Sequence, residues 1–270
     1  MYKIIACDLD YTLVNSRGEL TQKNIDAIKK ASKMGVKFVP ATGRGYFQAH
    51  PLLKTLDLFD KEEEYFCSFN GSLIVENHGQ KAIYYNGGIP WDVVKKLGEL
   101  SMKIDDIQMN FCTDQVMYRY YTPNRNFAFH EDKEDVAIVY EDLLKKENEH
   151  FIRLLIQTPS HERAEEVVEA LNTLKDELTY AISANRYIEV VRKGTSKGQG
   201  VVSLAKALGV DMKDVIAIGD SVNDNSMIIA AGLGCCVANS SPETIAVSDY
   251  VCHNSNDEDA VAEIIEKFIF

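Results

Sequence analysis

The sequence has no excess of positive charge. Its 270 residues include 29 Lys and Arg against 41 Asp and Glu, so the net charge at pH 7 is −12. Nucleic acids and anionic membranes are held mainly by clustered cations that attract their phosphate groups. The charge balance therefore argues against a nucleic-acid or membrane partner. An anionic substrate would need a local site made of cations and backbone N–H groups.

Zinc-type cysteine spacing and long apolar runs are also absent. No two cysteines form a C-x-x-C pair; the six are Cys7, Cys67, Cys112, Cys235, Cys236 and Cys252. No apolar segment approaches the length of a bilayer span, and the run after Met1 is too short for a signal peptide. We therefore expect small buried thiols in a protein of the reducing cytoplasm.

Both ends of the chain alternate between expected strands and helices. Short apolar runs predict strands at residues 4–7, 36–39 and 215–218. Helical spacing follows an N-cap at Thr21 and recurs at residues 197–208 and 257–268. This order is typical of a parallel α/β sheet covered by helices.

The middle of the chain has a different order of elements. We expect helices at residues 93–102, 136–146 and 162–174. Strands are expected at residues 107–112, 116–121 and 152–157 and near Ala181. No repeat or low-complexity linker separates the parts. The pattern indicates a split α/β core with a second, α+β domain inserted into it.

Two carboxylates follow the first expected strand, at Asp8 and Asp10. Ligands of open α/β sheets sit beyond the carboxyl ends of the strands. The chain turns at such an end, so one acid can face a metal and the other a leaving group. Turn and cap chemistry is the alternative, since Asp is common at such places. A calcium loop fails, because Leu13 replaces its required Gly and a strand precedes it.

Two further clusters suit an anion. Thr42, Gly43 and Arg44 follow the second strand and offer a hydroxyl, a close backbone approach and a cation, all of which suit phosphate. Lys197 lies in a Gly-rich stretch that opens a helix, where N–H groups are free for an anion. The spacing is not that of a Walker loop. Taken singly, a capped turn and a solvated lysine explain these clusters as well.

A last cluster follows the strand at residues 215–218 and contains Asp220, Asn223 and Asp224. Carboxylate and amide oxygens are ligands that suit Mg²⁺, a hard cation. A helix N-cap is the alternative, because Asp and Asn are favoured there. The combination is more specific than any single cluster, since all of them fall at matching strand or helix ends of one expected sheet.

In this order, the clusters resemble the haloacid dehalogenase superfamily of phosphohydrolases, and in particular its Cof-type subfamily. The motifs are D-x-D-x-T-L from Asp8, T-G-R from Thr42, N-G from Asn70, K-G from Lys197 and G-D-x-x-N-D from Gly219. The resemblance implies a Rossmann-like parallel-sheet core of residues 1–84 and 189–270. It also implies an inserted α+β cap domain of residues 85–188.

The resemblance further implies roles for these residues in a Mg²⁺-dependent phosphatase of a small phosphorylated substrate, such as a sugar or cofactor phosphate. Asp8 would be the nucleophile that forms an aspartyl-phosphate, and Asp10 the acid and base. Mg²⁺ would be held by Asp8, by the backbone carbonyl of Asp10, by Asp220 and with support from Asp224. The phosphoryl group would be bound by Thr42, Lys197 and Asn223 and by the backbone of Leu9 and Gly43.

One departure from the family pattern lies within the first motif. The family commonly has Gly where this chain has Tyr11, so a phenol near the entrance could narrow the site or touch the substrate. Arg44 is a second candidate at the entrance. Within the expected cap, the candidates for substrate contact are Arg119, Tyr121, Arg125, His130, Arg153 and Arg186. Surface or packing roles are the simpler explanation for each of these.

Two other functions remain open at this point. A phosphomutase would use the same core but pass the phosphoryl group to a second hydroxyl. A sensor would bind a phosphorylated ligand without turnover, but such proteins typically lack the nucleophile or the acid, and Asp8 and Asp10 are both present. Composition indicates nothing about the oligomeric state.

Overall fold

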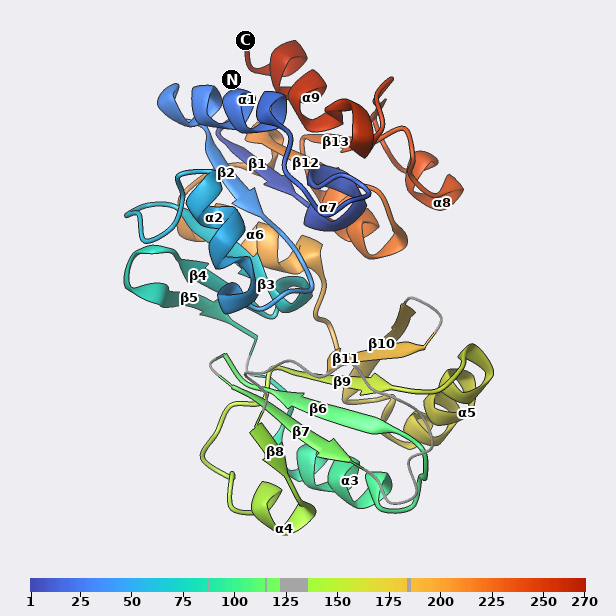
Figure 1. Cartoon of the computed structure of the whole chain (residues 1–270). Coiled ribbons are helices and arrows are strands. Elements are labelled where there is room, and N and C mark those ends of the chain that lie inside the picture. Colours follow the sequence, from blue (N-terminus) through green and yellow to red (C-terminus); the bar gives the residue numbers. More distant parts are fainter. Residues whose placement is uncertain (87, 115, 122–135, 184–185) are drawn as a thin grey trace. The chain divides into compact units, whose positions relative to one another are not determined.

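The structure, a computed structural model, describes all residues except 87, 115, 122–135 and 184–185, and leaves out the side chains of Tyr121 and Ser183. The chain divides into two compact units, one of Met1–Tyr85 with Ser196–Phe270 and one of Asn86–Thr195 (Figure 1). The family resemblance predicts an inserted domain that ends at residue 188. In the structure, strand β11 (Tyr187–Arg192) continues past that position and pairs with strands of the insert.

The first unit is built on a parallel sheet whose strand order is β14-β13-β12-β1-β2. From one edge to the other, the strands are Tyr250–Val251, Leu233–Cys236, Val215–Gly219, Ile4–Cys7 and Lys37–Pro40. In the central register, Cys7 of β1 is paired with Ile218 of β12 and with Pro40 of β2. The carboxyl ends of these three strands therefore meet at one edge of the sheet.

Helices cover both faces of this sheet. On one face, α6 (Lys197–Ala207) and α7 (Asn225–Ala230) pack on a buried cluster that includes Ile4, Ala6 and Ala217. Helices α1 (Gln22–Lys33) and α9 (Ala260–Phe268) pack together on the other face (Figure 1). Successive strand residues face opposite ways, and both sets are buried, so the central strands read as continuous apolar runs.

A small antiparallel sheet extends the first unit beyond β2. It consists of β3 (Tyr65–Ser68), β4 (Leu73–Glu76) and β5 (Lys81–Tyr85). A bridge between Ala41 and Cys67 joins it to the end of β2. Two short α-helices, α2 (His50–Thr55) and α8 (Pro242–Ile245), complete the described α-helices of this unit.

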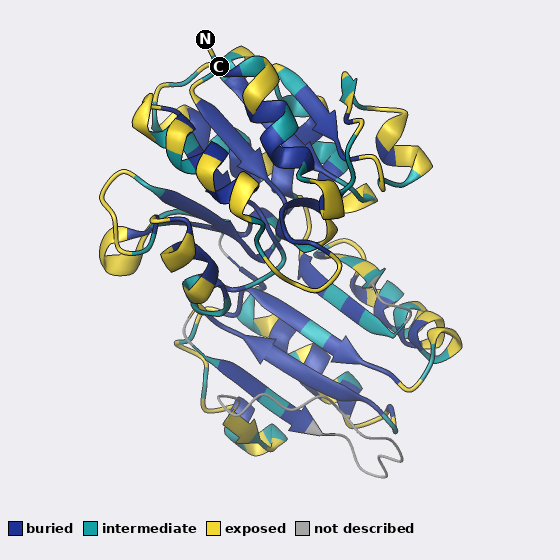
Figure 2. Ribbon diagram, turned by 45° about the horizontal axis from the view of Figure 1, so that its top comes forward, coloured by how far each residue is buried: buried dark blue, intermediate teal, exposed yellow. Residues whose placement is uncertain are grey.

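The second unit contains a sheet with strand order β10-β11-β9-β6-β7-β8. Besides β11, the strands are Gln108–Cys112 (β6), Met117–Tyr121 (β7), Val136–Ile138 (β8), Arg153–Gln157 (β9) and Leu178–Ser183 (β10). All pairs are antiparallel except β7 with β8. Helices α3 (Trp91–Ser101) and α5 (His161–Leu171) bury their apolar residues against the sheet (Figure 2), and α4 (Tyr140–Leu143) packs on α3.

The fold class predicted from the sequence is confirmed, with a few elements corrected. The expected helix at residues 136–146 is wrong, because its first residues form β8 and only Tyr140–Leu143 is helical. Val136 and Ile138 belong to residue types that favour a strand, and here they pair with the edge of β7. Strands β11, β13 and β14 were not predicted. The last two are short, and β13 contains Gly234, which weakens its strand signal.

The thiol prediction is confirmed, because all six cysteines are buried and free. Burial raises the pKa of the Cys67 thiol to about 12, since the thiolate would be removed from water. No helix in the described ranges combines the length and apolar character that a bilayer span requires.

Candidate active site

The turn after β1 holds the first pair of predicted site residues. Backbone pairing continues one residue beyond the strand, because Asp8 N–H donates to the carbonyl of Ile218 at 2.9 Å. This places the Asp8 side chain at the edge of the sheet, where it is 6% exposed. The chain then turns through residues 9–13, and Thr12 Oγ1 donates to Asp220 Oδ1 at 2.8 Å. The turns after β1 and β12 are thereby tied together.

Lys197 stands at the first turn of α6 and is almost completely buried. Its Nζ donates to Asp8 Oδ1 and to Asp224 Oδ1, at 2.5 Å in each case. The helix begins here because Ser196 caps it, with Oγ accepting from the N–H of Gln199. Burial disfavours the ammonium, but the charges of Asp8 and Asp224 outweigh that cost and raise the pKa of Lys197. Lys197 is therefore a fixed positive charge between two acids.

The turn after β12 supplies the remaining carboxylates. Asp224 is fully buried, and its Oδ2 accepts from the backbone N–H groups of Asp220 and Ser221 at 3.0 and 3.1 Å. A Cβ at Gly219 would lie 2.4 Å from the Cβ of Asp224, so only Gly lets this carboxylate approach the strand end. Asp224 is therefore held both by backbone N–H groups of the turn after β12 and by Lys197.

Three carboxylates of this site are close enough to share a cation. One oxygen from each of Asp8, Asp220 and Asp224 lies within 4.8 Å of the others. With the ammonium of Lys197, their formal charges sum to −2, which a divalent cation would neutralise. Burial raises the pKa of Asp8 well above its usual value, in spite of Lys197, and burial also raises the pKa of Asp220. An all-oxygen donor set with excess negative charge fits a hard cation such as Mg²⁺.

Asp10 is held apart from this carboxylate cluster. Its carboxylate accepts from two nitrogens of Arg44, Nε at 3.1 Å and Nη2 in a shorter contact. Side-chain exposure is 47% for Asp10 and 37% for Arg44, so the pair stands at the surface of the turn. Its carboxylate is accordingly not one of the three metal-facing groups. The backbone carbonyl, which the family resemblance indicated, is the part of Asp10 left for that role.

The predicted phosphate-binding residues occupy the neighbouring strand ends. Thr42 is buried just after β2, and its Oγ1 accepts from the backbone N–H of Arg44 at 3.2 Å. Leu9 is completely buried, and its backbone carbonyl accepts from the N–H of Val14 at 2.9 Å. Asn223 Oδ1 accepts from Ser221 Oγ at 2.7 Å in the turn after β12. Gly43 lies between Thr42 and Arg44.

Sequence reasoning missed the role of Thr12. It named the residue only as part of the first motif, whereas in the structure Thr12 orients Asp220 through its hydroxyl. The hydroxyl two residues after Asp10 was the available signal. Ser226 was missed as well, and its Oγ accepts from the N–H of Gly198 at 3.0 Å, which fixes the start of α6 against α7.

The candidates for substrate contact in the inserted domain fall in the second unit. Arg119 and Arg153 lie on β7 and β9, and the backbone of Tyr121 ends β7. Arg186 precedes β11, and its Nη2 donates to Tyr187 Oη at 3.3 Å. Arg125 and His130 lie outside the described residues.

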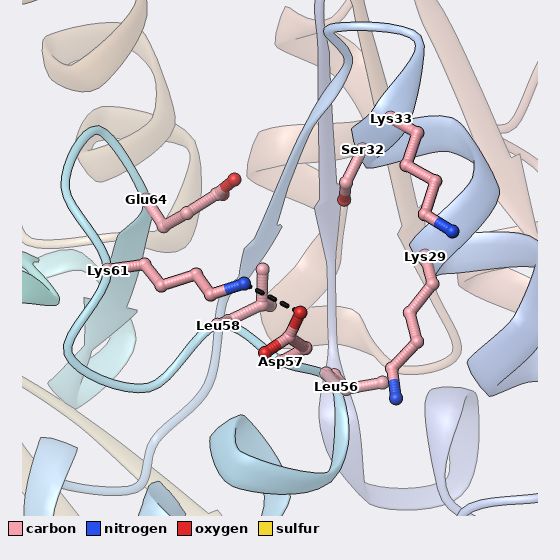
Figure 3. Close-up of a pocket in the computed structure, with 8 residues that line it drawn as sticks. All are labelled: Lys29, Ser32, Lys33, Leu56, Asp57, Leu58, Lys61 and Glu64. Atoms are coloured by element: carbon pink, nitrogen blue, oxygen red, sulfur yellow. Dashed lines mark hydrogen bonds and ion pairs between the residues drawn. The ribbon is translucent and has the colours of Figure 1, made fainter.

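A separate cavity of about 310 Å³ lies between α1 and the loop that precedes β3 (Figure 3). Lys29, Lys33 and Lys61 line it, and Lys61 Nζ is paired with Asp57 at 2.6 Å. None of the predicted site residues lines this cavity. We therefore do not count it as part of the candidate active site.

Comparison with known proteins gives a consistent result. The model of a family described as haloacid dehalogenase-like hydrolases matches residues 5–265. YxeH of Bacillus subtilis, provisionally named a phosphatase, is 29% identical over 100% of this chain and 99% of its own. The 5-amino-6-(5-phospho-D-ribitylamino)uracil phosphatase YwtE of Bacillus subtilis is 27% identical over 99% of this chain and 98% of its own.

A solved structure shows that the similarity extends to the fold. The crystal structure of a haloacid dehalogenase-like hydrolase from Bacteroides thetaiotaomicron superposes with a TM-score of 0.86 and 27% identity. The similarity covers 100% of both chains. Both units of this chain therefore have counterparts in that protein.

Proposed function

We propose that this chain, which belongs to the family of haloacid dehalogenase-like hydrolases and is a phosphatase, uses Mg²⁺ and a covalent aspartyl-phosphate on Asp8. The single observation that supports this most strongly is the buried Lys197 between Asp8 and Asp224, with Asp220 in the same carboxylate cluster. A structural ion pair would need one acid for one base. The excess of acids is what a metal-dependent phosphoryl site requires.

The nucleophile faces an electrostatic problem that these residues address. A carboxylate and a phosphate dianion repel each other, and the ammonium of Lys197 next to Asp8 reduces that repulsion. Bound Mg²⁺, held by Asp8, Asp220, Asp224 and the Asp10 carbonyl, would supply further positive charge. Asp224 holds Lys197 in place through a buried hydrogen bond, and Thr12 holds Asp220 through a part-buried one, so the site is preorganised.

The proposed reaction has two displacements at phosphorus. A carboxylate oxygen of Asp8 attacks, the phosphorus–oxygen ester bond breaks, and protonated Asp10 gives its proton to the departing alkoxide. Water then attacks the aspartyl-phosphate, Asp10 takes a proton from it, and Asp8 is released with inorganic phosphate. Thr42, Asn223 and the backbone of Leu9 and Gly43 are proposed to hold the phosphoryl oxygens in both steps.

The proposed substrate is a small phosphorylated metabolite, either a sugar phosphate or a cofactor phosphate. The name of the relative YwtE describes a substrate with a phosphorylated ribityl chain on a uracil ring. At 27% identity this supports the class of small phosphomonoesters and not that compound itself. Because the net charge of the chain is −12, an anionic substrate would have to be bound at a local cationic site.

The test is release of inorganic phosphate from a panel of phosphorylated metabolites, with Mg²⁺ and with EDTA. We expect activity that needs Mg²⁺ and is lost in Asp8→Asn. Asp26→Asn is the matched control, since Asp26 is an exposed acid on α1 that accepts only from Gln22 among described residues. Acid-quenched enzyme should retain phosphate covalently in the wild type and in Asp26→Asn, but not in Asp8→Asn. Full activity in Asp8→Asn would refute the proposal, and an isomerised ester in place of free phosphate would indicate a mutase.

A further inference from the structure

Tyr11 has a backbone conformation that its side chain disfavours. Its φ of 61° and ψ of 8° fall in the left-handed region, which glycine adopts freely. For a bulky residue this conformation costs about 1–2 kcal/mol, because the Cβ approaches the carbonyl oxygen. A glycine here would leave the turn intact without that cost. The phenol ring is therefore kept at the expense of backbone strain.

Packing does not compensate for the strain. The residue is 62% exposed, and in the part of the chain that the structure describes its side chain makes no hydrogen bond or ring contact. Its backbone is held instead, since its carbonyl accepts from Asn239 Nδ2 at 2.9 Å. The residues on either side are also fixed, Asp10 by Arg44 and Thr12 by Asp220. The turn thus imposes the conformation, and most of the residue remains exposed.

The position of Tyr11 links the ring to the reaction. Its Cα is about 3.8 Å from that of Asp10, the residue proposed to protonate the leaving oxygen. The turn tied to it through Thr12 and Asp220 exposes a second large apolar side chain, Val222, which is 59% exposed. Strained residues retained at a functional site commonly serve the ligand and not the fold.

On the basis of the proposed function, we propose that Tyr11 is a specificity-determining residue that contacts the leaving group and favours phosphomonoesters whose alcohol contains a flat ring. A ring can stack on the phenol and remove apolar surface from water, whereas a short polyol gains little from either. Asp10 precedes Tyr11 in the chain and is paired with Arg44, and these two residues can hydrogen-bond to the polar end of the alcohol.

The experiment compares two primary alkyl phosphates, benzyl phosphate and glycerol 1-phosphate, in the full-length enzyme with Mg²⁺. Tyr11→Gly should lower kcat/KM for benzyl phosphate about tenfold, mainly through KM, and change that for glycerol 1-phosphate less than twofold. Tyr11→Phe should keep the preference. Binding of benzylphosphonate, measured by calorimetry, should weaken about tenfold in Tyr11→Gly.

Gln80→Gly is the matched control, because Gln80 is exposed, has a φ of 52° and ends the short 3₁₀ helix His78–Gln80, outside the site. Both glycine variants should melt at or a few degrees above the wild type, but only Tyr11→Gly should change the substrate ratio. Equal effects on both phosphates, or a lower Tm in Tyr11→Gly with an unchanged ratio, would overturn the assignment. If no phosphate is released from any substrate, the proposed function fails. In that case, the benzylphosphonate affinity alone supports or overturns the role of Tyr11.

Discussion

Replacing Lys197 with Met gives the sharpest test of how the site is held together. The side chain is 1% exposed, and its ammonium contacts Asp8 and Asp224 at 2.5 Å each. Removing it leaves buried carboxylates without a compensating charge, which typically costs about 3–5 kcal/mol. The apolar part of Met fills most of the lysine stem, so a cavity contributes little to the loss.

Proton uptake by the variant sets an independent upper limit on this loss of stability. In place of burying an unpaired carboxylate, the variant can protonate it, which costs about 1.4 kcal/mol for each pH unit above an ordinary pKa of about 3.9. At pH 7 this limit is about 4 kcal/mol, in agreement with the first figure, and at pH 5 it is about 1.5 kcal/mol. We therefore expect Lys197→Met to lose about 4 kcal/mol at pH 7.

The sign of the pH dependence follows from the same linkage. Burial raises the pKa of Asp8 in the folded state, and loss of Lys197 removes the charge that opposes this rise. The folded variant then holds a proton that the unfolded chain releases, so its stability falls as the pH rises above about 4. The raised pKa of Lys197 in the wild type keeps its contribution present throughout this range, below its unfolded pKa of about 10.4. The deficit of the variant should therefore shrink toward pH 5.

The assay is urea unfolding followed by circular dichroism at pH 7 and pH 5, without divalent cations. The single tryptophan, Trp91, lies in the second unit, so its fluorescence reports that unit separately. Lys206→Met is the control, because Lys206 is an exposed lysine on the same helix, and its loss should be within about 0.5 kcal/mol. A deficit below about 1 kcal/mol at pH 7, or one that does not shrink at pH 5, would refute the reasoning.

Three further predictions concern Arg44, Gly71 and the six cysteines. Arg44→Gln should change the free energy of unfolding by less than about 1 kcal/mol, because the ion pair of Arg44 with Asp10 is part-exposed. The same variant should lower kcat about tenfold. Unchanged kcat would contradict a role of Arg44 in orienting Asp10. Gly71→Ala should lose more than about 2 kcal/mol in urea unfolding, since its φ is +90° and its Cβ would lie 2.1 Å from Ser196 O. Gly79→Ala, with a φ of +64° and open space around it, should lose only about 1 kcal/mol, and equal losses would show that the contact is unimportant. All six buried cysteines should resist Ellman's reagent in the folded protein and react in urea, whereas fast labelling of the native protein would contradict their burial.

Local pattern alone was enough to predict most of the core strands and helices of the first unit. The apolar run at β1 and the helix cap at Thr21 were read correctly because they depend on neighbours in the chain. Asp8 and Asp220 could be assigned to one edge of the sheet because parallel strands have their carboxyl ends together. The sequence-based prediction failed at β8 and β11, although both contain residue types that favour strands, because their pairing partners lie elsewhere in the chain.

The sequence by itself determined which chemical groups follow the strands of the first unit, because the apolar runs of β1 and β12 are followed directly by polar residues. Only the tertiary structure decided which of those groups contact one another. Asp8 and Lys197 are 189 residues apart, and no local pattern dictates their contact. Folding separates Asp10, paired with Arg44, from the three clustered carboxylates. It also puts Tyr11 in a left-handed conformation, because the hydrogen bonds that fix the turn come from residues distant in sequence.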